Sequence, residues 1–149
     1  MSILVRVSKE PIRHEQVAAE LGGREDGAQL VFWGLVRDHN DGRSVRAVTY
    51  DAHPQLAVRT FREIADEALA RWGDDLRVVI IHRTGTLEVG EASVVVGVAS
   101  AHRDEAYEAS RHVIEQLKVR SPIWKQEHYV DGDSEWLRGH SLRRAEGAA

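Results

Sequence analysis

The alternation of apolar and polar positions along the chain predicts a mixture of strands and helices. Ile3–Val7 alternates and predicts a short strand, whereas the apolar run Gln29–Val36 predicts a buried one. The polar stretch Asp38–Gly42 has strong turn chemistry and predicts a hairpin. The remaining strands are expected over residues 45–50, 78–81, 93–100 and 123–130.

The clearest predicted helix carries one continuous apolar stripe. Its members recur at helical spacing and are Phe61, Ile64, Ala65, Ala68, Leu69 and Trp72. Pro54 lies near the expected start of this helix, and Gly73 lies just past its expected end.

Two further helices are expected. One has Pro11 in its first turn and ends at Gly22, because proline suits a helix start and glycine suits a helix end. The other begins near Asp104, taken as its N-cap, and stops before Pro122.

The predicted order is strand, helix, two strands, helix, two strands, helix, strand. Hairpins that alternate with helices indicate the α+β class, here a sandwich of antiparallel or mixed sheet with about three helices. Residues 1–140 are expected to form a single domain, and residues 141–149 are expected to be a flexible tail.

Composition excludes several classes of chemistry. The chain has no cysteine, so thiolate metal sites, disulfides and a persulfide carried on the chain itself are excluded. A net charge of −4 argues against nucleic-acid binding by the chain as a whole. No apolar run is long enough to span a membrane and no leader pattern is visible, so a cytoplasmic location is expected.

The rarity of lysine makes its few positions informative. Only Lys9, Lys118 and Lys125 are lysines among the 20 basic residues, which leaves 17 arginines. Lys118 and Lys125 flank the helix break at Pro122, and a lysine beside apolar groups becomes a better base or nucleophile. Alternatively, Lys118 only complements a helix C-terminus and Lys125 is only solvated.

A second set of basic residues could bind an anion. His102 and Arg103 lie at a predicted helix N-terminus, which attracts phosphate groups. Arg37 follows the buried strand. A polar loop and an ordinary surface arginine are the alternative interpretations. The histidines form no convincing metal-binding pattern, so no metal and no cofactor are expected.

Four segments together resemble one known family. They are Phe32–Asn40, His82–Leu87, the pair His102 and Arg103, and Lys118–Glu127. In this order they are similar to motifs of the large, catalytic subunit of molybdopterin synthase, and the match extends from about Ile3 to Trp136.

The resemblance implies a hammerhead-type fold and a sulfurtransferase. Such an enzyme takes sulfur from the C-terminal Gly-Gly thiocarboxylate of a small ubiquitin-like subunit. It installs the dithiolene of molybdopterin on cyclic pyranopterin monophosphate, in a heterotetramer with a central homodimer of large subunits. The absence of cysteine fits this scheme, because the partner carries the sulfur.

The resemblance also implies roles for individual residues. Lys118 and Lys125 are expected to be catalytic, and Arg37, His102 and Arg103 are expected to bind the pterin substrate. The chain departs from many relatives at Gln126, His53 and Leu56.

Two functions of other classes remain open from the sequence. One is a non-catalytic binding module for a phosphorylated ligand or an acidic peptide tail, which would use the same basic residues. Retention of both lysines in so arginine-rich a chain argues against it. The other is a metal-dependent phosphohydrolase, which lacks a carboxylate–histidine cluster in this sequence.

Overall fold

The computed structural model describes residues 2–138, and this part of the chain forms nine strands and three helices. In chain order they are β1 (Ile3–Ser8), α1 (His14–Leu21), β2 (Ala28–Leu35), β3 (His39–Asn40), β4 (Arg43–Ala52), α2 (Pro54–Trp72), β5 (Arg77–Arg83), β6 (Gly85–Glu88), β7 (Ala92–Ser100), α3 (Arg103–Arg120), β8 (Ile123–Tyr129) and β9 (Ser134–Arg138). The expected tail, residues 141–149, lies outside the described residues.

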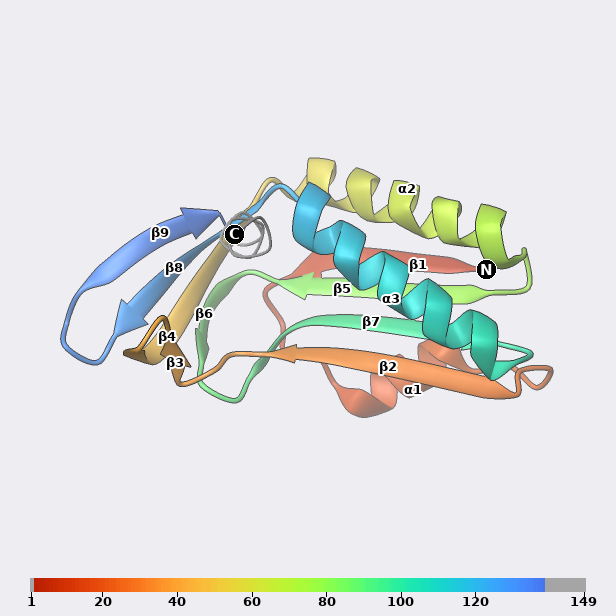
Figure 1. The fold of residues 1–149 in the computed structure, drawn as a ribbon, viewed down its shortest axis with the longest axis horizontal. Coiled ribbons are helices and arrows are strands. Elements are labelled where there is room, and N and C mark those ends of the chain that lie inside the picture. Colours follow the sequence, from red (N-terminus) through yellow and green to blue (C-terminus); the bar gives the residue numbers. More distant parts are fainter. Residues whose placement is uncertain (1, 139–149) are drawn as a thin grey trace.

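The strands form two sheets that lie side by side (Figure 1). The first sheet has the order β1-β5-β7-β2, in which β1 is parallel to β5 and the other pairs are antiparallel. The second has the order β3-β4-β8-β9, with β6 paired to β4, and is antiparallel throughout. This arrangement confirms the predicted α+β class.

Helices cover both faces of the first sheet, α2 and α3 on one side and α1 on the other (Figure 1). Strand β5 is therefore apolar on both faces: Val78 and Ile80 pack with α2 and α3, whereas Val79 and Ile81 pack with α1. A third apolar cluster lies at the second sheet and combines Val36, which follows β2, with Val45, Val48, Leu87 and Tyr129 of the sheet.

The predicted ends of α2 are confirmed, since Pro54 is its first residue and Gly73 is its C-cap. His53 caps its start, because its Nδ1 accepts a hydrogen bond of 3.2 Å from the backbone N–H of Leu56. Gly22 likewise caps the end of α1 as predicted.

Two predicted helix starts are wrong. Pro11 lies three residues before α1, which begins at His14 with Arg13 as N-cap. The N-cap of α3 is His102, not Asp104. Asp104 instead lies in the first turn, where its charge still favours the positive end of the helix dipole.

The candidate site lies at the junction between the two sheets. Helix α3 packs on the first sheet and ends at Arg120, and after Pro122 the chain enters β8 in the second sheet. Strand β4 pairs with β8 over residues 45–52 of β4. Side chains from β4, β5, α3 and β8 therefore meet where the sheets adjoin.

Candidate active site

A small cavity at this junction contains both of the lysines singled out in the sequence. Its volume is about 50 Å³. Lys118 enters it from the last turn of α3 and Lys125 enters it from β8. The rest of its lining consists of Tyr50, His82, Val94, Ile114, Leu117, Ser121 and Ile123. The break at Pro122 thus turns the chain so that two residues seven positions apart face one space.

Lys125 is paired with a buried carboxylate. Its Nζ lies 3.4 Å from Oε2 of Glu127, whose side chain is almost completely buried. Lys125 and Glu127 are two positions apart on β8 and so project from the same face of the strand. Because a buried carboxylate needs compensation for lost water, this ion pair offsets part of the cost of burying Glu127.

Glu127 accepts hydrogen bonds from two further side chains. Nδ2 of Asn40 lies 2.9 and 3.0 Å from its two oxygens, and the hydroxyl of Tyr129 donates at 2.8 Å. Burial alone would raise the pKa of Glu127, but the bonds from Asn40 and Tyr129 and the charge of Lys125 hold that pKa below its usual value. Burial and the adjacent carboxylate raise the pKa of Tyr129 to about 12.

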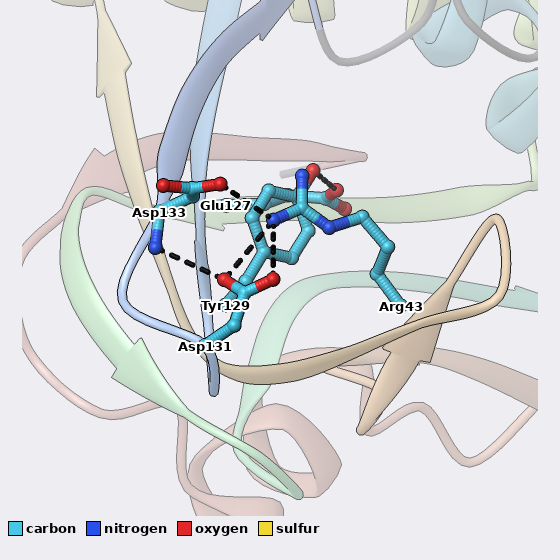
Figure 2. A network of polar contacts seen from close by, with 5 residues as sticks. All are labelled: Arg43, Glu127, Tyr129, Asp131 and Asp133. Carbon is cyan, nitrogen blue, oxygen red and sulfur yellow. Dashed lines mark hydrogen bonds and ion pairs between the residues drawn. The ribbon is translucent and has the colours of Figure 1, made fainter.

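Arg43 holds Tyr129 in place from the other side. Figure 2 shows its guanidinium over the tyrosine ring, 3.6 Å from the ring centroid, and between Asp131 and Asp133. Its Nη2 donates to Asp131 at 2.9 and 3.1 Å and to Asp133 at 3.2 Å. A chain of contacts therefore runs from the β8–β9 turn through Tyr129 and Glu127 to Lys125.

Arg37 joins the same network at its edge. This exposed residue follows β2, and its Nη2 donates to Oδ1 of Asn40 at 3.4 Å. Asn40 in turn holds Glu127. The structure therefore connects Arg37 to Lys125 through two intervening side chains.

The fold of a single chain does not place His102 and Arg103 at this cavity. They lie exposed at the N-terminus of α3, in a shallow depression lined also by Gly27, Ala101, Asp104 and Glu105. Arg103 and Lys118 are 15 residues apart on one helix, which corresponds to about 22 Å along the helix axis. A single copy of the chain thus keeps His102 and Arg103 apart from Lys118 and Lys125.

A larger groove adjoins the cavity. Its volume is about 590 Å³, and it shares Ile114 and Lys118 with the cavity. It lies between β2 and α3, where Phe32 is 40% exposed and Tyr107 is 62% exposed. Such exposure of two aromatic rings on one groove is typical of a surface that binds a flat ligand or a partner.

No role was predicted from the sequence for Glu127, Tyr50, His82 or Asn40. Glu127 pairs with Lys125, Tyr50 and His82 line the cavity of the lysines, and Asn40 donates to Glu127. The period of two along a strand could have paired Glu127 with Lys125. Asn40 and His82 lie in segments that carried the family resemblance, but no local pattern gave them or Tyr50 a role beside the lysines.

Two other kinds of site find no support in the described part of the chain. Residues 2–138 contain no group of three or more His, Asp or Glu side chains that could hold a metal ion. Neither α2 nor α3, the longest helices described, carries the apolar run that a membrane span requires.

Comparison with known proteins identifies relatives over most of the chain. The family model described as MoaE protein matches residues 7–120. The molybdopterin synthase catalytic subunit of Synechococcus elongatus is 44% identical over 138 residues, which cover 93% of this chain and 84% of that protein.

Comparison with solved structures finds relatives of the same family. The crystal structure of molybdopterin synthase from Staphylococcus aureus superposes with a TM-score of 0.82 at 34% identity, covering 88% of this chain and 94% of that one. A chain in the complex of subunits 1 and 2 of molybdopterin-converting factor from Helicobacter pylori has a TM-score of 0.68, with 93% and 90% coverage, and at 20% identity it shows the fold alone. The chain therefore belongs to the MoaE family, the family of molybdopterin synthase catalytic subunits.

Proposed function

We propose that this molybdopterin synthase subunit transfers sulfur from the C-terminal thiocarboxylate of a small ubiquitin-like protein to cyclic pyranopterin monophosphate. The product is the dithiolene of molybdopterin. The observation that carries the proposal is the shared cavity of Lys118 and Lys125.

The two lysines suit an anionic sulfur donor. Lys125 forms an ion pair with the buried Glu127, which places its positive charge beside the space that Lys118 also lines. A thiocarboxylate entering this space would be neutralised there. Lys118 would then act as acid, base or transient covalent partner while the sulfur bonds to a carbon of the pterin side chain and displaces the oxygen substituent of that carbon. Water would cleave the resulting thioester and release the partner as a carboxylate, and two such transfers would give the dithiolene.

The donor is proposed to reach the cavity as an extended tail. A Gly-Gly tail has no side chains, so it can enter a narrow space and be fixed by backbone hydrogen bonds and its terminal charge. The Helicobacter pylori chain of the same fold occurs in a complex of two subunits. A small partner subunit is accordingly part of this proposal.

The pterin is proposed to occupy the adjoining groove. Phe32 and Tyr107 offer ring faces to a flat heterocycle, and Lys118 lies where the groove meets the cavity. The exposed guanidinium of Arg37 is proposed to bind the substrate's anionic end.

His102 and Arg103 complete the proposed substrate site only if a second copy supplies them. The length of α3 keeps them away from Lys118 in their own chain. The resemblance implies a central homodimer, and such a dimer can bring the N-terminus of one α3 toward the cavity of the other copy.

The direct test is incubation of the chain with thiocarboxylated partner and precursor. Dithiolene product is expected with the full-length partner and none with a partner that lacks its last two residues. Tight binding of both ligands without product would instead identify a non-catalytic binding module. Turnover with the truncated partner would contradict the tail-insertion step.

Two broader expectations belong to the same proposal. A single domain over residues 1–140 is supported by three apolar clusters that together span both sheets. Limited proteolysis should leave this unit intact. The cytoplasmic location can be tested by cell fractionation.

A further inference from the structure

His82 borders the cavity of the two lysines but takes no part in the anion binding described above. It lies near the end of β5, and protein atoms surround its ring. The ring nevertheless keeps some accessible surface, because it lines the cavity. Tyr50 meets the ring edge-on, with centroids 5.1 Å apart and an interplanar angle of 68°. These contacts fix the plane of the imidazole.

The backbone selects one tautomer of this imidazole. Nδ1 of His82 lies 2.7 Å from the carbonyl oxygen of Arg83. A carbonyl oxygen can only accept, so Nδ1 must carry the hydrogen. Burial, together with the positive charge of Lys118, lowers the pKa of His82 to about 4, although the bond to Arg83 opposes this shift. At neutral pH the ring is therefore uncharged, and Nε2 keeps its lone pair.

Four side chains that line the cavity with His82 carry hydrogen-bond donors: Tyr50 from β4, Lys118 from α3, Ser121 from the turn and Lys125 from β8. Lys125 is paired with Glu127. The cavity lining includes no carboxylate. The buried hydroxyl of Ser121 makes no hydrogen bond with any described residue, and Lys118 is the lining residue whose positive charge acts on the imidazole.

We propose that His82 is a positioning residue for sulfur transfer: its Nε2 accepts a hydrogen bond from the amine of Lys118 and so directs that amine into the cavity. The proposal rests on the proposed function of Lys118. It assigns different partners to the two lysines. Glu127 forms an ion pair with Lys125, whereas a neutral imidazole accepts an N–H from an ammonium and, more weakly, from a neutral amine. Lys118 thereby stays oriented in both protonation states.

The tautomer can be measured directly in the unmodified chain. With ¹⁵N-labelled histidine, the eight imidazoles give separate nitrogen signals, and His82 is assigned through its backbone. Nε2 of His82 is expected to be unprotonated and Nδ1 protonated from pH 6 to 9. Lys118→Met should shift the Nε2 signal of His82, and Ser121→Ala should not.

His112 is the matched control in the same spectra. It also has an edge-on aromatic neighbour, Trp72 at 5.5 Å, but it lies against Glu67 and outside the cavity. Its signals should not respond to Lys118→Met. A protonated Nε2 on His82, or a His82 signal that responds to Ser121→Ala and not to Lys118→Met, would overturn the proposal.

The effect of His82 on the titration of Lys118 can be measured separately, because the chain has only three lysines. With ¹³C-labelled lysine Cε, His82→Phe should lower the titration midpoint of Lys118 and leave Lys9 and Lys125 unchanged. His82→Gln offers an acceptor oxygen in place of Nε2 and should restore the midpoint. At saturating partner, kcat should fall roughly tenfold in His82→Phe, the effect of one lost hydrogen bond, and recover in His82→Gln.

An unchanged Lys118 midpoint in folded His82→Phe would contradict the positioning role. If His82→Phe does not fold, the tautomer measurement still decides. Wild-type protein that forms no dithiolene would overturn the proposed function, whereas a wrong tautomer overturns only the role of His82. The two failures are therefore distinguishable.

Discussion

At position 118 the proposed role of the side chain depends on its ability to lose a proton. Lys118→Arg keeps the positive charge and a similar reach but removes the accessible neutral amine. If the amine acts as nucleophile or proton carrier, Lys118→Arg and Lys118→Ala should both lose about 10²-fold or more in kcat. Single-turnover sulfur transfer at saturating partner is the measurement, so that weaker docking is not mistaken for slower chemistry.

The corresponding change at Lys125 provides the contrast. Lys125→Arg keeps a cation beside Glu127 and should retain more activity than Lys118→Arg, because Lys125 is proposed to supply charge only. Near-normal turnover of Lys118→Arg would show that Lys118, like Lys125, supplies only a positive charge.

The pKa of His82 makes a prediction about stability and pH. The folded chain holds this pKa at about 4, below the ordinary value of 6.5, so the unfolded state binds the proton more readily. Above pH 6.5 this difference in pKa does not change the free energy of unfolding. Between pH 6.5 and pH 4 it lowers the free energy of unfolding by an increasing amount, to roughly 3 kcal/mol at most. In urea titrations His82→Gln should lose less stability than wild type between these pH values. Parallel curves would show that His82 does not titrate in this range.

The residues of the site were predictable to different degrees. Lys118 and Lys125 stood out because lysine is rare here and Pro122 lies between them. Asn40 could not be found in this way, since it meets Glu127 across 87 positions of sequence. Only the folded chain brings such pairs together.

On the scale of elements, the contact between α1 and the first sheet depends on one glycine. A Cβ at Gly97 of β7 would lie 2.7 Å from Cδ1 and 3.2 Å from Cγ of Leu21, a fully buried residue of α1. Gly97→Ala should therefore push α1 from the sheet and lower the free energy of unfolding by about 1–3 kcal/mol. Chemical denaturation measures this loss.

The double variant Leu21→Ala with Gly97→Ala is the control for this steric argument. Removing the leucine side chain makes room for the new methyl group, so the two losses should not add. Strict additivity would show that Gly97 matters through backbone conformation and not through its contact with Leu21.

Elements were predicted best where their signals were local. Helix α2 has a long apolar stripe, a proline at its start and a glycine at its end, and both ends were predicted correctly. The short strands β3, β6 and β9 were missed. They have two to five residues and are defined by pairing with β4 or β8, which a local pattern does not reveal.

At the scale of the whole molecule, α3 separates the two halves of the proposed site. Lys118 lies at one end, and Arg103 lies about 22 Å away at the other. If a second copy supplies Arg103, each complete site uses Lys118 of one chain and Arg103 of its partner. A dimer of Lys118→Ala with Arg103→Ala then contains one intact site and one doubly defective site.

This arrangement predicts complementation between two inactive proteins. After equal amounts of the Lys118→Ala and Arg103→Ala chains exchange at random, half of the dimers are mixed and half of their sites are intact, so about one quarter of wild-type activity should return. Mixing Lys118→Ala with Lys125→Ala is the control. Both lysines line one cavity of one chain, so every site in that mixture keeps a defect and no activity should return. Recovery in the control, or none in the test mixture despite verified exchange, would place Arg103 outside a site shared between copies.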